Sequence, residues 1–179
     1  MKIINLYTDG ACSGNQYAEN KGGWGAILEY GQHQKELWGG EVNTTNNKME
    51  MTALLEGLKS LNQNDLTIHV YSDSSYLIEC FTKKWYIKWQ MNGWMTAAKS
   101  PVENRELWEA LLEQIQRQKE IGFYRVKGHL NLSREQEIAK WFKKFQEWNG
   151  SHFTLEDFKY VVKRNIQADA LANRGMEQI

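Results

Sequence analysis

Apolar residues along this chain follow two patterns, short continuous or alternating runs and repeats at helical spacing. The runs predict five strands, at about residues 2–8, 24–30, 35–42, 66–72 and 123–127. Apolar positions three and four residues apart predict helices at about 48–61, 74–81, 103–119, 134–149 and 155–173. Three strands in succession, followed by alternating strands and helices, indicate an α/β fold with a mixed sheet flanked by helices.

Polar residues predict where several of these helices begin and end. The segment 44–47 offers several N-cap candidates, and the segment 133–136 (Ser-Arg-Glu-Gln) has the form of a capping box. Asn149 and Gly150 predict the end of one helix, and Thr154 is a weaker start signal for the last one.

Four carboxylates occupy positions where a charge is costly. Asp9 and Asp73 each follow an apolar strand, and such residues converge if the two strands are neighbours. Glu50 lies one turn inside the first helix, near its apolar stripe, and Asp169 follows Ile166 at helical spacing. Each has an ordinary alternative explanation: a turn or cap for the two aspartates, a favourable helix dipole for Glu50, and a buried salt bridge for Asp169.

Carboxylates brought together repel one another, and a divalent cation removes that cost. Two unit charges 4 Å apart interact by about 4 kcal/mol at an effective dielectric constant of 20. A ligand set made only of carboxylates favours Mg²⁺ or Mn²⁺ over Zn²⁺. Two such ions held by shared carboxylates are suited to phosphodiester hydrolysis. Spacing alone makes this metal site a weak hypothesis.

Composition narrows the class of protein. The 179 residues suit one domain over 1–179, and 22 basic residues balance 22 acidic ones, which excludes a uniformly basic nucleic-acid coat. Two cysteines exclude a disulfide framework and favour a reducing compartment, so we expect a cytoplasmic protein. No apolar run approaches the roughly 20 residues of a membrane span, and no obligate protein partner is indicated, so a monomer is expected.

Several sequence strings together closely resemble type 1 ribonuclease H. They are YTDGACSGN, GGWGAIL, TTNNKMEMTALLEGL, VYSDSSYL, VKGH and NIQADALANRG, in this order along the chain. The resemblance implies a ribonuclease H-like fold, whose five-stranded sheet has three antiparallel strands and then two parallel ones. It also implies an endonuclease that cuts the RNA strand of RNA–DNA hybrids with two Mg²⁺ ions, for which Mn²⁺ can substitute.

The resemblance assigns roles to individual residues. Asp9, Glu50, Asp73 and Asp169 match the catalytic metal-binding acids, and His129 matches a loop histidine that assists proton transfer or product release. The residues that match contacts to the hybrid are Asn15, Thr45, Asn46 and Asn47, whose short amides and hydroxyls suit the 2′-OH. Thr45 and the two asparagines beside it also fit a helix cap.

The segment 81–102, called the protrusion below, carries lysines and tryptophans and no acid. It resembles the family's basic protrusion, which contacts the DNA strand, and Lys88, Lys99, Trp85 and Trp94 are its candidate substrate contacts. The alternative is a solvated face over core tryptophans, and Trp89 and Trp108 are the expected core residues.

An extra segment at about 130–163 separates His129 from Asp169, which lie closer together in the family. Its apolar stripe must pack on the domain or on a partner, and we expect it to pack beside the active site. Its lysines, 140, 143 and 144, are candidates for a second substrate contact.

Two other functions remain compatible with the sequence. One is an enzyme on the same fold with another substrate, such as DNA, and the other is a hybrid-binding module without activity. The complete set of acids argues against the second.

Overall fold

A computed structural model of the chain describes residues 3–14 and 19–179. Five strands form one sheet in the order β3-β2-β1-β4-β5. They are β1 (Ile3–Ser13), β2 (Lys21–Tyr30), β3 (His33–Val42), β4 (Thr67–Ser72) and β5 (Glu120–Arg125). β1, β2 and β3 pair antiparallel, whereas β4 pairs parallel with both β1 and β5. The predicted mixed sheet is therefore confirmed.

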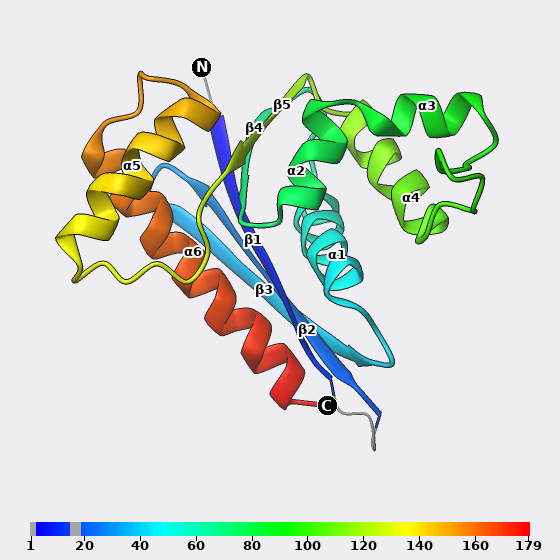
Figure 1. Cartoon of the computed structure of the whole chain (residues 1–179), viewed down its shortest axis with the longest axis horizontal. Helices are drawn as coiled ribbons and strands as arrows, with labels where there is room; N and C mark the ends of the chain where they lie inside the picture. Colours follow the sequence, from blue (N-terminus) through cyan, green and yellow to red (C-terminus); the bar gives the residue numbers. More distant parts are fainter. Residues whose placement is uncertain (1–2, 15–18) are drawn as a thin grey trace.

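In the described part of the chain, six helices flank the two faces of this sheet (Figure 1). They are α1 (Asn46–Lys59), α2 (Ser75–Thr82), α3 (Trp85–Met91), α4 (Arg105–Gln116), α5 (Glu135–Asn149) and α6 (Leu155–Glu177). On one face, α1, α2 and α4 share a core with Leu6 of β1, whereas α5 and α6 share a second core with the next residue, Tyr7. Side chains alternate between the faces of a strand, so neighbouring residues of β1 enter different cores.

Helix α6 lies very close to the backbone of β2. A Cβ at Gly25 would stand 2.5 Å from the carbonyl oxygen of Ala168, so only glycine permits this approach. Nearer the start of α6, Arg164 pairs with Glu29 of β2 at 2.6 Å, and Tyr160 donates a hydrogen bond to the same carboxylate. These contacts determine where α6 meets the sheet.

The first strand is longer than its apolar run. We expected it to end near residue 8, but β1 continues to Ser13 opposite β2, with Asp9 beside Gly25. Its parallel pairing with β4 does end there, at Thr8 and Ser72. Asp9 therefore lies inside a strand, at the point where one of its two neighbours stops.

The predicted capping box at 133–136 is wrong. Arg134 is the N-cap of α5 and makes no side-chain cap, because Ser133 bonds instead to the side chain of Asn131. The weaker signal at Thr154 forms a complete capping box with Asp157. Helix α3 was not predicted, because its seven residues are too few to show a repeat.

The amphipathic helix of the extra segment, α5, packs against β5 and α6 as expected. Ile138 and Phe145 are buried, and the ring of Phe145 lies 5.3 Å from that of Phe158 on α6. The side chain of Asn149 makes both hydrogen bonds to the backbone of Arg125 at the end of β5. The expected limit of the segment near residue 163 falls within α6, which runs on without a break.

Candidate active site

Asp9 and Asp73 meet at the edge where the parallel pair of strands ends. Asp9 is 2% exposed in β1, and Asp73 directly follows the last residue of the neighbouring β4. One carboxylate oxygen from each of Asp9, Glu50 and Asp73 lies within 4.8 Å of the others. The predicted convergence of these acids is therefore present in the structure.

Glu50 reaches this edge because it lies in the first turns of α1, which begins at Asn46 and lies close to β1. Thr45 is the N-cap and accepts a hydrogen bond from the backbone N–H of Lys48 at 3.1 Å. A Cβ at Gly10 would stand 2.6 Å from the backbone nitrogen of Glu50, so glycine beside Asp9 permits the approach. Glu50 is 3% exposed, and its Oε2 has no hydrogen-bond partner among the described residues. A buried carboxylate oxygen without a donor, facing two other carboxylates, fits a bound cation.

Asp169 lies near this cluster, but the buried face of α6 is not the one that the sequence pattern predicted. Ile166, placed beside it by the sequence pattern, is 42% exposed and points away from the core. Asp169 is half-buried at the edge of the true buried face, and its charge contributes to the raised pKa values of Glu50 and Asp73. It is therefore a neighbour of the three acids, although it is not within their 4.8 Å group.

Asn165 is a residue of the site that the sequence analysis missed. It is 4% exposed, one turn before Asp169, and its amide nitrogen makes no hydrogen bond of ordinary geometry among the described residues. It is close enough to Asp73 to lower the pKa of that carboxyl. A polar residue four positions before a candidate ligand on a helix is the signal that could have found it.

The pKa values of the three clustered carboxyls are all raised above their ordinary values. Burial, and then the charges of Glu50 and Asp73, raise the pKa of Asp9. Burial, and then the charge of Asp73, raise the pKa of Glu50. Burial also raises the pKa of Asp73, against the opposing effects of Asp9, Asn165 and His129. Ionised carboxylates in this cluster would repel one another, and a bound divalent cation would offset that repulsion.

The metal-free protein is expected to lose stability as the pH rises. The pKa values of these carboxyls start from 3.8 and 4.5 and are raised on folding, so above about pH 4 the folded state binds more protons than the unfolded chain. The free energy of unfolding should then fall as the pH approaches neutral, and Mg²⁺ should restore it by binding only the folded cluster.

Thermal melts in EDTA and in millimolar Mg²⁺, at pH 5 and pH 8, test this expectation. The Mg²⁺-dependent increase in melting temperature should be larger at pH 8, where fewer protons compete for the carboxylates. An equal increase at both pH values, or none, would contradict a preformed acid cluster.

His129 lies on the rim of a pocket above these acids. The pocket has a volume of about 280 Å³, and its lining residues are Asp9, Gly10, Asn46, Glu50, Asp73, Lys127, Gly128 and His129. His129 is exposed and has a left-handed backbone conformation, with φ of 57°. The imidazole is therefore open to solvent beside the acids.

Three of the four residues expected to contact the hybrid lie at the start of α1. Asn46 lines the pocket, and Thr45 and Asn47 are exposed beside it at the start of α1. Asn15 lies outside the described residues. The cap and substrate-binding interpretations of Thr45 are compatible, because its hydroxyl can accept from Lys48 and remain exposed.

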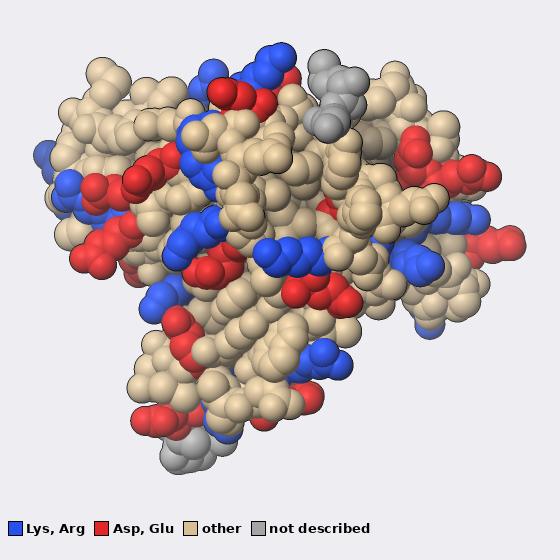
Figure 2. Space-filling view, turned by 180° about the vertical axis from the view of Figure 1, so that it is seen from behind, with Lys and Arg blue, Asp and Glu red and all other residues tan. Residues whose placement is uncertain are grey.

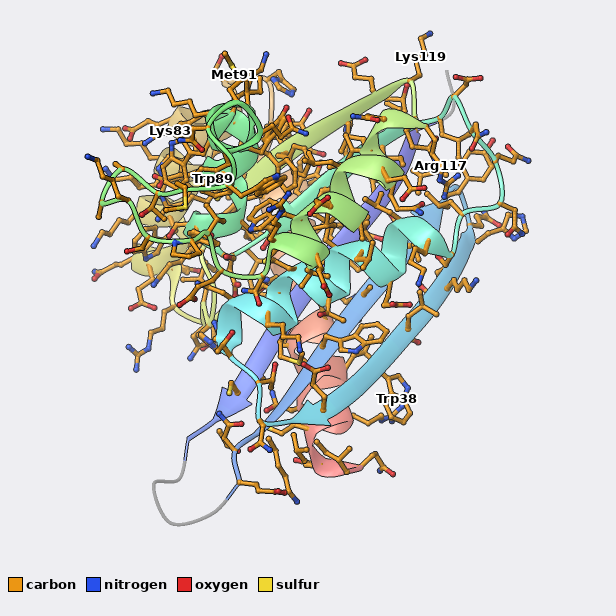
Figure 3. All side chains as sticks on the ribbon, turned by 90° about the vertical axis from the view of Figure 1, so that its right-hand side faces the viewer. Trp38, Lys83, Trp89, Met91, Arg117 and Lys119 are labelled. Atoms are coloured by element: carbon orange, nitrogen blue, oxygen red, sulfur yellow. The ribbon has the colours of Figure 1, made fainter. Side chains whose placement is uncertain are left out.

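In the protrusion, the structure separates core tryptophans from surface lysines. Trp94 is 7% exposed and belongs to the core with Trp108, so its proposed contact with substrate is not supported. Trp89 is only partly buried, contrary to the expectation of a core residue, and Trp85 is also partly buried. Figure 3 shows Lys83 and Met91 in this region, away from Lys119. Lys88 and Lys99 are exposed.

Comparison with known proteins decides the family. The sequence profile of the RNase H family matches residues 1–177. The chain belongs to the RNase H family. It is 48% identical over 126 residues to a ribonuclease H of Saccharopolyspora erythraea, covering 70% of this chain and 79% of that protein. A ribonuclease H of Moorella thermoacetica is 47% identical over 129 residues, covering 72% and 82%.

Solved structures support the same fold for this RNase H. LC9-RNase H1, described as a type 1 RNase H with the type 2 active-site motif, is 21% identical with a TM-score of 0.63, covering 93% of this chain and 84% of that one. LC11-RNase H1, solved in complex with RNA/DNA hybrid, is 18% identical with a TM-score of 0.61, covering 98% and 97%.

Family membership makes this RNase H a nuclease. The described part of the chain contains no helix that is both long and apolar enough to cross a membrane.

Proposed function

We propose that this RNase H hydrolyses the RNA strand of RNA–DNA hybrids with two divalent ions, normally Mg²⁺, for which Mn²⁺ can substitute. The observation that carries the proposal is the close group of Asp9, Glu50 and Asp73, in which the buried Oε2 of Glu50 has no hydrogen-bond partner among the described residues. A site of carboxylate oxygens suits these hard cations. When bound, the ions would activate a water molecule and neutralise charge on the scissile phosphate.

The protein contributes ligands, orientation and a proton carrier. Asp9 and Asp73 would hold metal where the parallel pairing of β1 and β4 ends. Glu50 would add a ligand from α1, and Asp169 would complete the set from α6. Asn165 would keep Asp73 oriented. His129 would take up or release a proton at the rim of the pocket, where its ring is exposed.

Recognition of the hybrid would use groups around the same pocket. Thr45, Asn46 and Asn47, with Asn15, offer donors and acceptors for the 2′-OH and the minor groove. Lys88 and Lys99 on the protrusion would contact backbone phosphates of the DNA strand, and Trp85 would support that surface.

Cleavage of end-labelled substrates in Mg²⁺ tests the proposal. The hybrid should be cut in its RNA strand, whereas duplex DNA of the same sequence should remain intact, and Asp73→Asn should cut neither. Cleavage of duplex DNA would instead indicate a DNA-directed nuclease. Binding of the hybrid without cleavage would indicate a binding module.

His129→Ala should slow turnover by one to two orders of magnitude and should not abolish it. A positioned acid–base group contributes about 10²–10⁴-fold, and the metal-dependent step would continue without this one at a lower rate. Steady-state cleavage at saturating hybrid and Mg²⁺ measures the effect. A variant as inactive as Asp73→Asn would show that His129 has a larger role than proposed.

A further inference from the structure

Two lysines contact the same tryptophan ring beside the active site. The Nζ of Lys127 lies 5.0 Å from the centre of the Trp141 ring, and the Nζ of Lys140 lies 5.1 Å from it. Lys127 belongs to the loop that carries His129, and it lines the pocket above the acid cluster. Lys140 and Trp141 belong to α5, so this contact joins the rim of the pocket to the extra helix.

The position of Trp141 on α5 shows which way this edge of the helix faces. Ile138 and Phe145 point into the core, whereas Trp141 and Trp148, two turns apart, lie half-buried at its edge. The guanidinium of Arg125, at the end of β5, lies 4.1 Å from the centre of the Trp148 ring. The tryptophan edge of α5 therefore faces the end of β5 and the loop that leads to His129.

The charges of Lys127 and Lys140 are not neutralised by the protein. Both side chains are exposed, and neither forms an ion pair among the residues that the structure describes. Lys144, one turn further along α5, differs because it pairs with Glu147 at 3.6 Å. An indole face orients an ammonium group without cancelling its charge, so both ammonium groups remain available to an anion.

A polyanionic substrate needs such local cations in this molecule. The net charge is zero, and acidic and basic side chains alternate over the face in Figure 2. Figure 1 places α3 of the protrusion and α5 at opposite sides of the molecule. Lys88 and Lys99 supply exposed cations on the side of α3, and Lys127 and Lys140 supply them on the side of α5.

We propose that Lys127 and Lys140, held by the ring of Trp141, form a phosphate-binding extension of the active site for the hybrid backbone next to the scissile phosphate. This inference rests on the proposed function, because it requires a nucleic-acid strand to cross the acid cluster. It gives α5 a role in substrate binding in addition to its packing on β5 and α6.

Lys140→Gln tests the proposal, with Lys119→Gln as the matched control. Lys119 is also an exposed lysine, but it precedes β5, whereas Lys127 follows it (Figure 3). Binding of a labelled hybrid is measured by fluorescence anisotropy in EDTA, so that no cleavage occurs, between 50 and 200 mM salt. Lys140→Gln should weaken binding about threefold to tenfold at 50 mM salt and reduce the salt slope by about one, the loss of one phosphate contact. Lys119→Gln should match the wild type.

Cleavage kinetics in Mg²⁺ give a second readout. Lys140→Gln should raise KM several-fold and leave kcat within twofold, because the contact would be to a neighbouring phosphate and not to the reacting atoms. Equal binding and equal salt slopes for the two variants, or a hybrid that does not bind the wild type at all, would overturn the phosphate-binding extension. Failure of the wild type to cleave a hybrid that it binds would overturn the proposed function alone.

Discussion

Asp73→Asn is expected to abolish cleavage of the hybrid while leaving hybrid binding largely intact. Asp73 follows β4 and belongs to the carboxylate group with Asp9 and Glu50. An amide keeps the shape of the side chain but lacks the charge that holds a cation. The bound metal contributes several kcal/mol of charge stabilisation to such reactions, so the rate should fall more than about 10³-fold.

Binding should respond differently from cleavage in this variant. Removing one of the clustered carboxylates reduces repulsion between the site and the phosphates of the hybrid, so affinity should be unchanged or slightly higher. Single-turnover cleavage and anisotropy binding measure the two effects separately, and the increase in melting temperature with Mg²⁺ should be reduced or lost.

Asp65→Asn is a suitable control for this substitution. Asp65 precedes β4, whereas Asp73 follows it, and Asp65 is exposed with a φ of 60° that asparagine tolerates. It should cleave like the wild type. Unimpaired turnover by Asp73→Asn would remove Asp73 from the proposed metal ligands.

Phe145→Ala should lower the free energy of unfolding by about 3–5 kcal/mol. Phe145 is 0% exposed, and its ring lies 5.0 Å from that of Phe153 and 5.3 Å from that of Phe158. Removing it leaves a cavity between α5 and α6, which the surrounding rings fill only in part. Trp141→Ala should lower the free energy of unfolding by less than Phe145→Ala does, because Trp141 is only half-buried. A fully buried Trp141 would give a loss similar to that of Phe145→Ala.

Urea unfolding measures this loss, with Met91→Ala as the control. Met91 is also a large apolar side chain, but it is 83% exposed, so its truncation should change stability by no more than about 0.5 kcal/mol. Because Phe158 and Asp169 share α6, the Phe145 variant should also bind Mg²⁺ more weakly. Equal stabilities of the two variants would show that α5 does not contribute to the core as the structure indicates.

The sequence was sufficient to predict every strand, every helix except α3, and most of the site's chemistry. Apolar periodicity depends on local geometry, which is why the positions of the five strands along the chain and the amphipathic character of α5 could be predicted. The acids could be named because the motif strings around Asp9, Glu50 and Asp73 resemble one family. Their convergence in the structure agrees with that assignment.

Other features depend on contacts between distant parts of the chain. Asp9 lies inside β1 because β2 continues to pair with that strand beyond the last residue of β4. Trp94 is buried because other parts of the chain cover it, and Ile166 is exposed because none does so fully. No local pattern specifies such neighbours.

The surroundings of the acid cluster likewise arise only in the folded chain. Asn165 meets Asp73 because α6 crosses the sheet at a place determined by the absence of a side chain at Gly25. Lys127 and Lys140 share the ring of Trp141 because α5 packs against the end of β5. Hydrophobic periodicity records which face of an element is buried, whereas the partner that covers it is selected by shape and close packing across the whole domain.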